Sequence, residues 1–280
     1  MPPLKPLKIT SVQRNTNGYK RSNIEKGVVQ PVSKIRKKYV LQLIIRCIVW
    51  VLCCCLCIFR PEEFEILEGA NFFSRFSVLH LLWAAWMFDM VLQIIPMKNN
   101  ISLGSQKLFV NRFKPIREKI DYEALRNYIR TTTKAAYKVM LLWVALIAAI
   151  GILYWTGFFR KIDLFMITVC FYVFDLICVL IWCPFRLLMR TRCCTTCRIF
   201  NWDHFMMFSP IIFVGGIYAV SLVVMSLLAW VVWELYIMMY PERFWDKSNA
   251  ALKCSECTDK LCTQYCQKLR KEQAETPHTK

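Results

Sequence analysis

Uncharged apolar stretches alternate with blocks rich in Lys and Arg along this chain. Four of the apolar stretches have about 20 residues, enough for a helix to cross about 30 Å of hydrocarbon at 1.5 Å per residue. We therefore predict four transmembrane helices, at 39–59, 76–96, 137–159 and 164–185. They form two transmembrane hairpins, one over 39–96 and one over 137–185.

A fifth apolar stretch, 204–240, contains residues that break helices. Pro210 lacks a backbone donor, and the pair Gly215-Gly216 offers a turn. As a helix, residues 204–214 would rise only about 17 Å, which is too little to cross. We expect a C-terminal re-entrant hairpin, with one tilted span as the alternative. The predicted fold is an all-α integral membrane protein, a polytopic bundle of four full transmembrane helices plus this hairpin.

The composition agrees with a membrane protein, because 56% of the residues are hydrophobic while the net charge is +18. Soluble domains rarely combine these values, since long apolar runs leave little polar surface. Segregation of the two residue classes along the chain resolves the conflict. Apolar blocks face lipid, and basic blocks face the cytoplasm or anionic headgroups.

The charged segments predict the orientation in the membrane. Residues 1–38 hold ten Lys or Arg and one acid, which indicates a disordered cytoplasmic arm. With few aromatic residues, the arm is expected to bind lipid headgroups and no nucleic acid. Segment 60–75 has four Glu against two Arg and is predicted outside. Segments 97–136, with nine basic and three acidic residues, and 186–200, with four Arg, are predicted inside.

The cytoplasmic loop 97–136 contains a further helix pattern. Asp121 is a predicted N-cap, and Tyr122, Leu125 and Ile129 recur at helical spacing. We expect an amphipathic helix that lies on the inner leaflet, with packing against the cytoplasmic cysteine region as the alternative.

Two cysteine clusters flank the last apolar stretch. The first belongs to a cytoplasmic knuckle at 186–203, and the second to a cytoplasmic tail at 241–280. Paired Cys-x-x-Cys motifs are typical of tetrahedral structural zinc sites. The predicted ligands are Cys194, Cys197, Cys254 and Cys257, with Cys193, Cys262, Cys266 and His204 as further candidates. An iron–sulfur cluster, a thiol–disulfide redox pair and ordinary reduced cysteines are the alternatives.

Charged or ionisable side chains inside apolar stretches form a second candidate site. Arg46 and Asp89 each lie about seven residues from the cytoplasmic end of their span, so the two can pair across antiparallel helices. Asp175 can share Arg46, and His80 lies nearer the outside. These residues predict either an ion pair that fixes helix register or a polar pathway for a proton or small solute.

The run from Cys193 to His204 and the tail around Cys254 resemble an uncharacterised family of Cys-rich bacterial membrane proteins. The resemblance implies a bacterial inner membrane and points to no particular activity. No phosphate-binding loop or nucleophile motif is present in the sequence, so whether the chain is an enzyme stays open. Our leading interpretation is a non-enzymatic scaffold or accessory subunit with a protein partner at its cytoplasmic face. The alternatives are a membrane redox protein and a solute or proton-coupled transporter.

Overall fold

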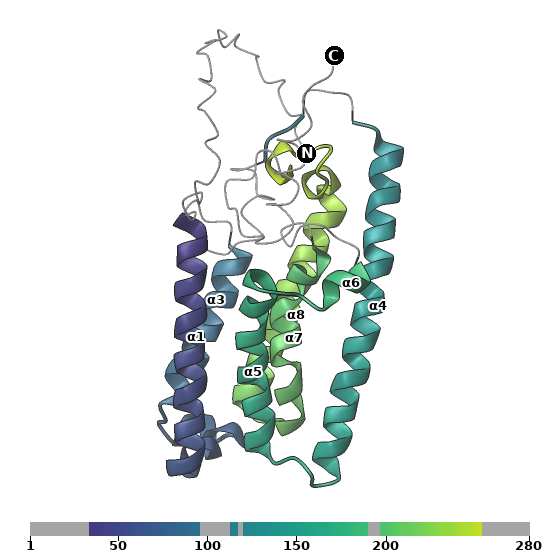
Figure 1. The fold of residues 1–280 in the computed structure, drawn as a ribbon. Helices are drawn as coiled ribbons and strands as arrows, with labels where there is room; N and C mark the ends of the chain where they lie inside the picture. Colours follow the sequence, from purple (N-terminus) through teal and green to yellow (C-terminus); the bar gives the residue numbers. More distant parts are fainter. Residues whose placement is uncertain (1–33, 96–112, 117–119, 190–196, 254–280) are drawn as a thin grey trace, which may run out of the picture. The chain divides into compact units, whose positions relative to one another are not determined.

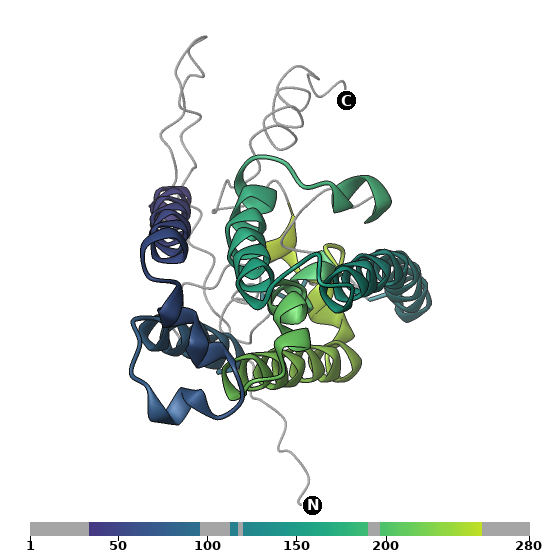
Figure 2. The same ribbon diagram turned by 90° about the horizontal axis from the view of Figure 1, so that it is seen from below.

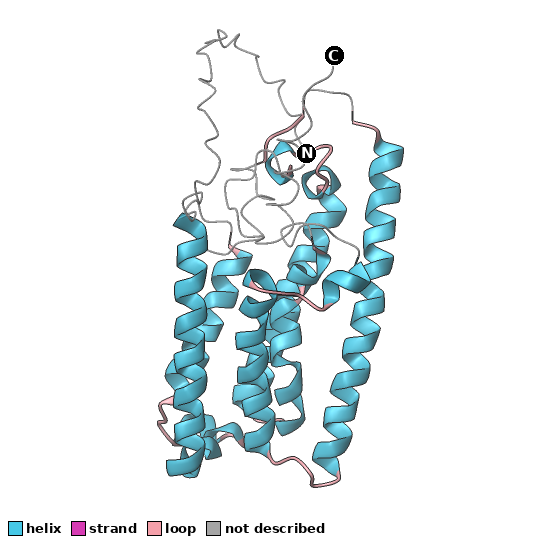
Figure 3. Ribbon diagram, in the orientation of Figure 1, coloured by secondary structure: helices cyan, strands magenta, loops and turns pink. Residues whose placement is uncertain are grey.

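The computed structural model describes residues 34–95, 113–116, 120–189 and 197–253, all within one compact unit, 32–280 (Figures 1 and 3). Every regular element in this part is helical, and one isolated bridge joins Pro115 to Asn249. The α-helices are α1 (Lys34–Phe59), α2 (Asn71–Ser74), α3 (Leu79–Ile94), α4 (Tyr122–Trp155), α5 (Lys161–Leu180), α6 (Phe185–Met189), α7 (Asp203–Phe208) and α8 (Ile217–Met239). The 3₁₀ helices are η1 (Pro61–Leu67), η4 (Arg198–Asn201), η5 (Ser209–Val214), η6 (Pro241–Phe244) and η7 (Ala250–Leu252).

Within the described residues, four helices are long and apolar enough to cross a membrane: Arg36–Phe59, Tyr122–Trp155, Lys161–Leu180 and Ile217–Met239. The prediction of an all-α membrane protein is confirmed at this level. The set differs in one member, because α8 qualifies and α3 does not. The 16 residues of α3 rise only about 24 Å. Its start is set by Ser77, whose hydroxyl accepts a hydrogen bond from the Leu79 amide at 3.2 Å.

The longest helix, α4, joins a predicted loop helix to a predicted span. Asp121 caps it as expected, since its carboxylate accepts from the amides of Glu123 and Ala124, both at 3.0 Å. The helix then runs unbroken for 34 residues, about 51 Å. The predicted loop helix therefore runs directly into the predicted third span, and one helix covers both. Residues 122–150 contain no Pro or Gly that would kink the helix where the two parts join.

The segment 203–240 runs out along the bundle and back. Both α7 and η5 pack against α8. At the turn between η5 and α8, Gly215 adopts φ +73°. The Ile217 amide then donates to the Gly69 carbonyl at 3.1 Å. From Pro210 onward the first limb is 3₁₀ rather than α, and the steeper rise of about 2 Å per residue extends its reach. The turn thus lies against the loop that follows η1.

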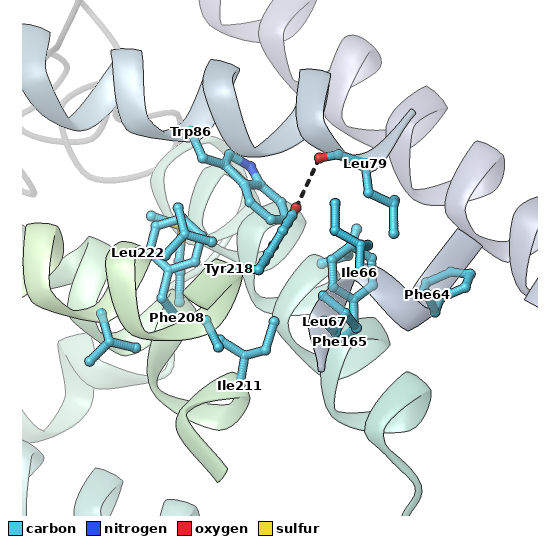
Figure 4. Close-up of a cluster of buried hydrophobic side chains, with 14 of the residues drawn as sticks. Phe64, Ile66, Leu67, Leu79, Trp86, Phe165, Phe208, Ile211, Tyr218 and Leu222 are labelled. Atoms are coloured by element: carbon cyan, nitrogen blue, oxygen red, sulfur yellow. Dashed lines mark hydrogen bonds between the residues drawn. The ribbon is translucent and has the colours of Figure 1, made fainter. Parts of the chain in front are cut away.

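Packing around this turn forms the largest buried hydrophobic cluster in the part of the chain that the structure describes (Figure 4). The Tyr218 hydroxyl donates to the Leu79 carbonyl at 3.2 Å, and both side chains are buried. Trp86 packs on Phe208 with ring centroids 5.2 Å apart. This apolar cluster joins α1, η1, α3, α5, α7, η5 and α8. Around it, α1 packs lengthwise against α5, and α3 against α8 (Figure 2).

Gly151 marks a close approach between α4 and η5. A Cβ atom at this position would lie 2.5 Å from the Phe213 ring. We expect Gly151→Ala to cost about 1–3 kcal/mol of unfolding free energy, because the ring must move out of a packed interface. Unfolding by SDS titration in mixed micelles measures the loss. Gly151→Ala with Phe213→Leu should cost less than the sum of the two single changes; additive costs would contradict the steric explanation.

Candidate functional site

Two groups of polar side chains meet inside the bundle, and the first is an ion pair between α1 and α5. Arg46 Nη1 lies 2.8 Å from Asp175 Oδ2, and both side chains are largely buried. The same nitrogen donates to the Tyr172 carbonyl at 2.6 Å, and the guanidinium lies 4.0 Å from the centre of the Tyr172 ring. The Arg46 guanidinium is therefore held by the Asp175 carboxylate, by the Tyr172 carbonyl and by the face of the Tyr172 ring.

The second group links α3 to α7 through His204. Its Nδ1 lies 2.7 Å from Asp203 Oδ1, and its Nε2 lies 3.4 Å from Asp89 Oδ2. Gln93 donates to Asp203 at 3.5 Å. Because both ring nitrogens face carboxylates, this geometry favours the doubly protonated, cationic ring. The imidazole thus clamps two helices that are far apart in the sequence.

The pairing agrees with the sequence interpretation in part. Asp175 pairs with Arg46, as the sequence allowed, whereas Asp89 pairs with His204 and not with Arg46. His80 is separate from this cluster: its Nε2 lies 2.8 Å from the Phe72 carbonyl, and its ring stacks on Phe76 near the start of α3.

Three members of the cluster were not predicted: Tyr172, Gln93 and Asp203. Asp203 carried a usable signal, because it is an acid directly before His204 at the edge of an apolar stretch. Tyr172 contributes through its backbone carbonyl and ring face, which no sequence motif reveals.

The predicted metal ligands fall mostly outside the described residues. This holds for Cys193, Cys194, Cys254, Cys257, Cys262 and Cys266. Cys197 is described and half-buried, and it packs against a core cluster that includes Ala136 and Trp202. In the part of the chain that the structure describes, no group of three His, Cys, Asp or Glu could hold a metal ion. His204 is directed to the two carboxylates, so neither ring nitrogen is left for a metal.

The residue after Cys197 is anchored between two long helices. Arg198 forms an ion pair with Glu234 of α8 and donates to the Thr133 hydroxyl of α4 at 2.6 Å. The side chain is only 9% exposed, so this bridge is buried. Next to it, Trp202 stacks on Trp230 of α8 with centroids 5.9 Å apart.

The segment before Cys254 is anchored to the same two helices. Leu252 packs against Trp233 of α8, and Trp245 stacks on Tyr128 of α4 at 6.0 Å. Asn249 is fully buried and fixes the local chain, since its amide donates to the Arg243 carbonyl at 2.9 Å. Trp233 and Glu234 are neighbours in α8, so both cysteine-bearing segments begin at one end of the bundle.

Comparison with protein-family models, with curated proteins and with solved structures found no match. The resemblance to a bacterial membrane family therefore stays a prediction.

Proposed function

We propose that this chain is a non-enzymatic scaffold or accessory subunit of a bacterial inner membrane. In this proposal, a cytoplasmic zinc site of cysteines holds the C-terminal tail to the helix bundle. The ligands would be Cys194, Cys197, Cys254 and Cys257, and a closed thiolate site of this kind stabilises structure without catalysis.

One observation carries the proposal: Arg198 and Leu252 contact adjacent residues of α8, Glu234 and Trp233. Arg198 directly follows Cys197, and Leu252 lies two residues before Cys254. The residue after the first knuckle and a residue just before the second thus contact neighbouring positions of α8, despite the apolar excursion between them. This proximity is what a shared tetrahedral site requires.

The same contacts support a hairpin that enters and leaves the membrane on the cytoplasmic side. Segment 203–240 would descend through α7 and η5, turn at Gly215-Gly216 and return through α8. The turn would lie near the outer surface, since it contacts the loop after η1, within the acidic segment 60–75. The amino terminus and the C-terminal tail would then both be cytoplasmic.

The polar cluster around Arg46 fits a structural role in this proposal better than a pathway. Going from the cluster toward the η1 end, three of the four contributing helices present a buried aromatic side chain: Trp86 in α3, Phe165 in α5 and Phe208 in α7. A proton or solute path would need polar groups or water in that layer. The ion pairs would then hold the helices in register.

Metal analysis of the purified full chain tests the zinc site. We expect about one zinc per chain, which the double variant Cys194→Ser/Cys257→Ser should lose. The matched control is Cys47→Ser/Cys55→Ser, which removes two exposed cysteines of α1 and should keep the metal. Iron with visible absorbance would favour the redox alternative. Metal retained equally by both variants would contradict a cysteine site.

The position of the C-terminus tests the topology separately. A reporter fused after Lys280 should be active on the cytoplasmic side. A periplasmic location of the reporter would contradict the shared zinc site, because Cys197 and Cys254 would then lie on opposite faces of the membrane.

A further inference from the structure

One face of α3 is apolar, exposed and carries a single carboxylate. This outer α3 face consists of Leu81, Ala84, Ala85, Phe88 and Asp89, all of them exposed. Leu81 and Phe88 are 65% and 63% exposed, whereas the opposite side of the helix, with Trp86 and Met90, is buried. The two alanines would let another helix approach closely. Such a face fits a second helix better than water.

Asp89 is the most exposed carboxylate of the polar cluster. Within the described residues its one ion-pair contact is His204 at 3.4 Å, and its side chain is 51% exposed. Asp175 has Arg46 at 2.8 Å, and Asp203 has His204 at 2.7 Å. Among the residues that the structure describes, three carboxylates thus face two cations, even when His204 is charged. The excess negative charge falls on the side chain that reaches the outer α3 face.

The depth of Asp89 makes that excess costly. It lies five residues before the end of α3 at Ile94, about 7.5 Å along the axis. Asp175 lies five residues before the end of α5 at Leu180 and is paired. An acid at this depth is stabilised by a cation from a neighbouring helix.

We propose that the outer α3 face binds a transmembrane helix of a different protein, and that this helix carries a Lys or Arg that pairs with Asp89. A second copy of this chain does not fit, because it would bring the same carboxylate to the same depth. The only basic residue of α1 near that depth, Arg46, is engaged with Asp175. This inference does not depend on the cysteine site.

The test uses a model helix as the partner. The full chain and a single-span Leu/Ala peptide, each labelled for energy transfer, are reconstituted in phosphatidylcholine vesicles. One peptide carries a Lys about 7 Å inside the hydrocarbon, and its control carries Leu there. We expect association with the Lys peptide to be about fivefold stronger. Equal association of the two peptides with the wild-type chain would overturn the proposal, and this comparison needs no variant.

Variants locate the effect. Asp89→Asn should remove the preference for Lys, Asp89→Glu should keep it, and Glu62→Gln should leave it unchanged. Glu62 is an exposed carboxylate on η1, far along the sequence from the outer α3 face. Persistence of the preference in Asp89→Asn would overturn the proposal. Loss of the preference when phosphatidylethanolamine is added would overturn it too, because a lipid ammonium would then be the partner.

Discussion

Gly216→Ala should destabilise this protein more than a methyl group added at any other glycine that the structure describes. A Cβ atom there would lie 1.9 Å from the Leu67 carbonyl oxygen and 2.8 Å from its carbon. Both are backbone atoms, so no side-chain rotation relieves the overlap. The turn would have to leave the η1 loop, at a cost of at least about 3 kcal/mol. SDS titration in mixed micelles measures the change in unfolding free energy.

The neighbouring glycine provides the control. Gly215 has φ +73° and open space around its Cβ position. Gly215→Ala should therefore cost only the backbone strain, about 1–2 kcal/mol. Gly216 itself has an ordinary φ of −76°. Glycine is therefore needed at this position only because the Leu67 carbonyl approaches closely. Equal losses for the two variants would contradict this division of roles.

Much of the fold followed from the pattern of apolar stretches. Stretches long enough to span predicted α1, α4 and α5, and Asp121 predicted the cap of α4. The predicted span began at residue 76, whereas α3 begins at Leu79. The Ser77 hydroxyl accepts from the Leu79 amide and donates to the Glu63 carbonyl, and the second of these contacts is tertiary, so the sequence does not reveal it. The continuity of α4 was missed because its first part carries charged residues and its second part is apolar. The sequence pattern therefore suggested a loop helix and a span, although one helical backbone covers both.

The polar cluster was predictable in composition and only in part in its pairing, since Asp175 was expected to share Arg46 but Asp89 was not expected to pair with His204. Charged residues are rare in apolar stretches, and for this reason the sequence pattern identified Arg46, Asp89 and Asp175. Counting residues from a span end gives depth to within about one turn. It gives no rotation about the helix axis, and that rotation decides that Arg46 faces α5 while Asp89 faces α7. His204 was attributed to the cysteine knuckle because of its sequence position.

Breaking the Arg46–Asp175 pair should be severely destabilising, whereas replacing both residues should not. Asp175→Leu leaves a buried guanidinium with only the Tyr172 carbonyl and ring, and Arg46→Met leaves a buried carboxylate. Each single variant should lose about 3–5 kcal/mol of unfolding free energy. The double variant should lie within about 1 kcal/mol of the wild type, since two apolar side chains can fill the same interface.

A matched pair on the surface shows whether burial causes the effect. Arg160 Nε lies 3.3 Å from Asp163 Oδ2, and these side chains are 74% and 33% exposed. The corresponding cycle there should give a coupling below about 1 kcal/mol. Additive losses at Arg46 and Asp175 would contradict a structural pair. A folded double variant would also separate the roles of the cluster, because a register lock tolerates apolar replacement whereas a charge-carrying pathway does not.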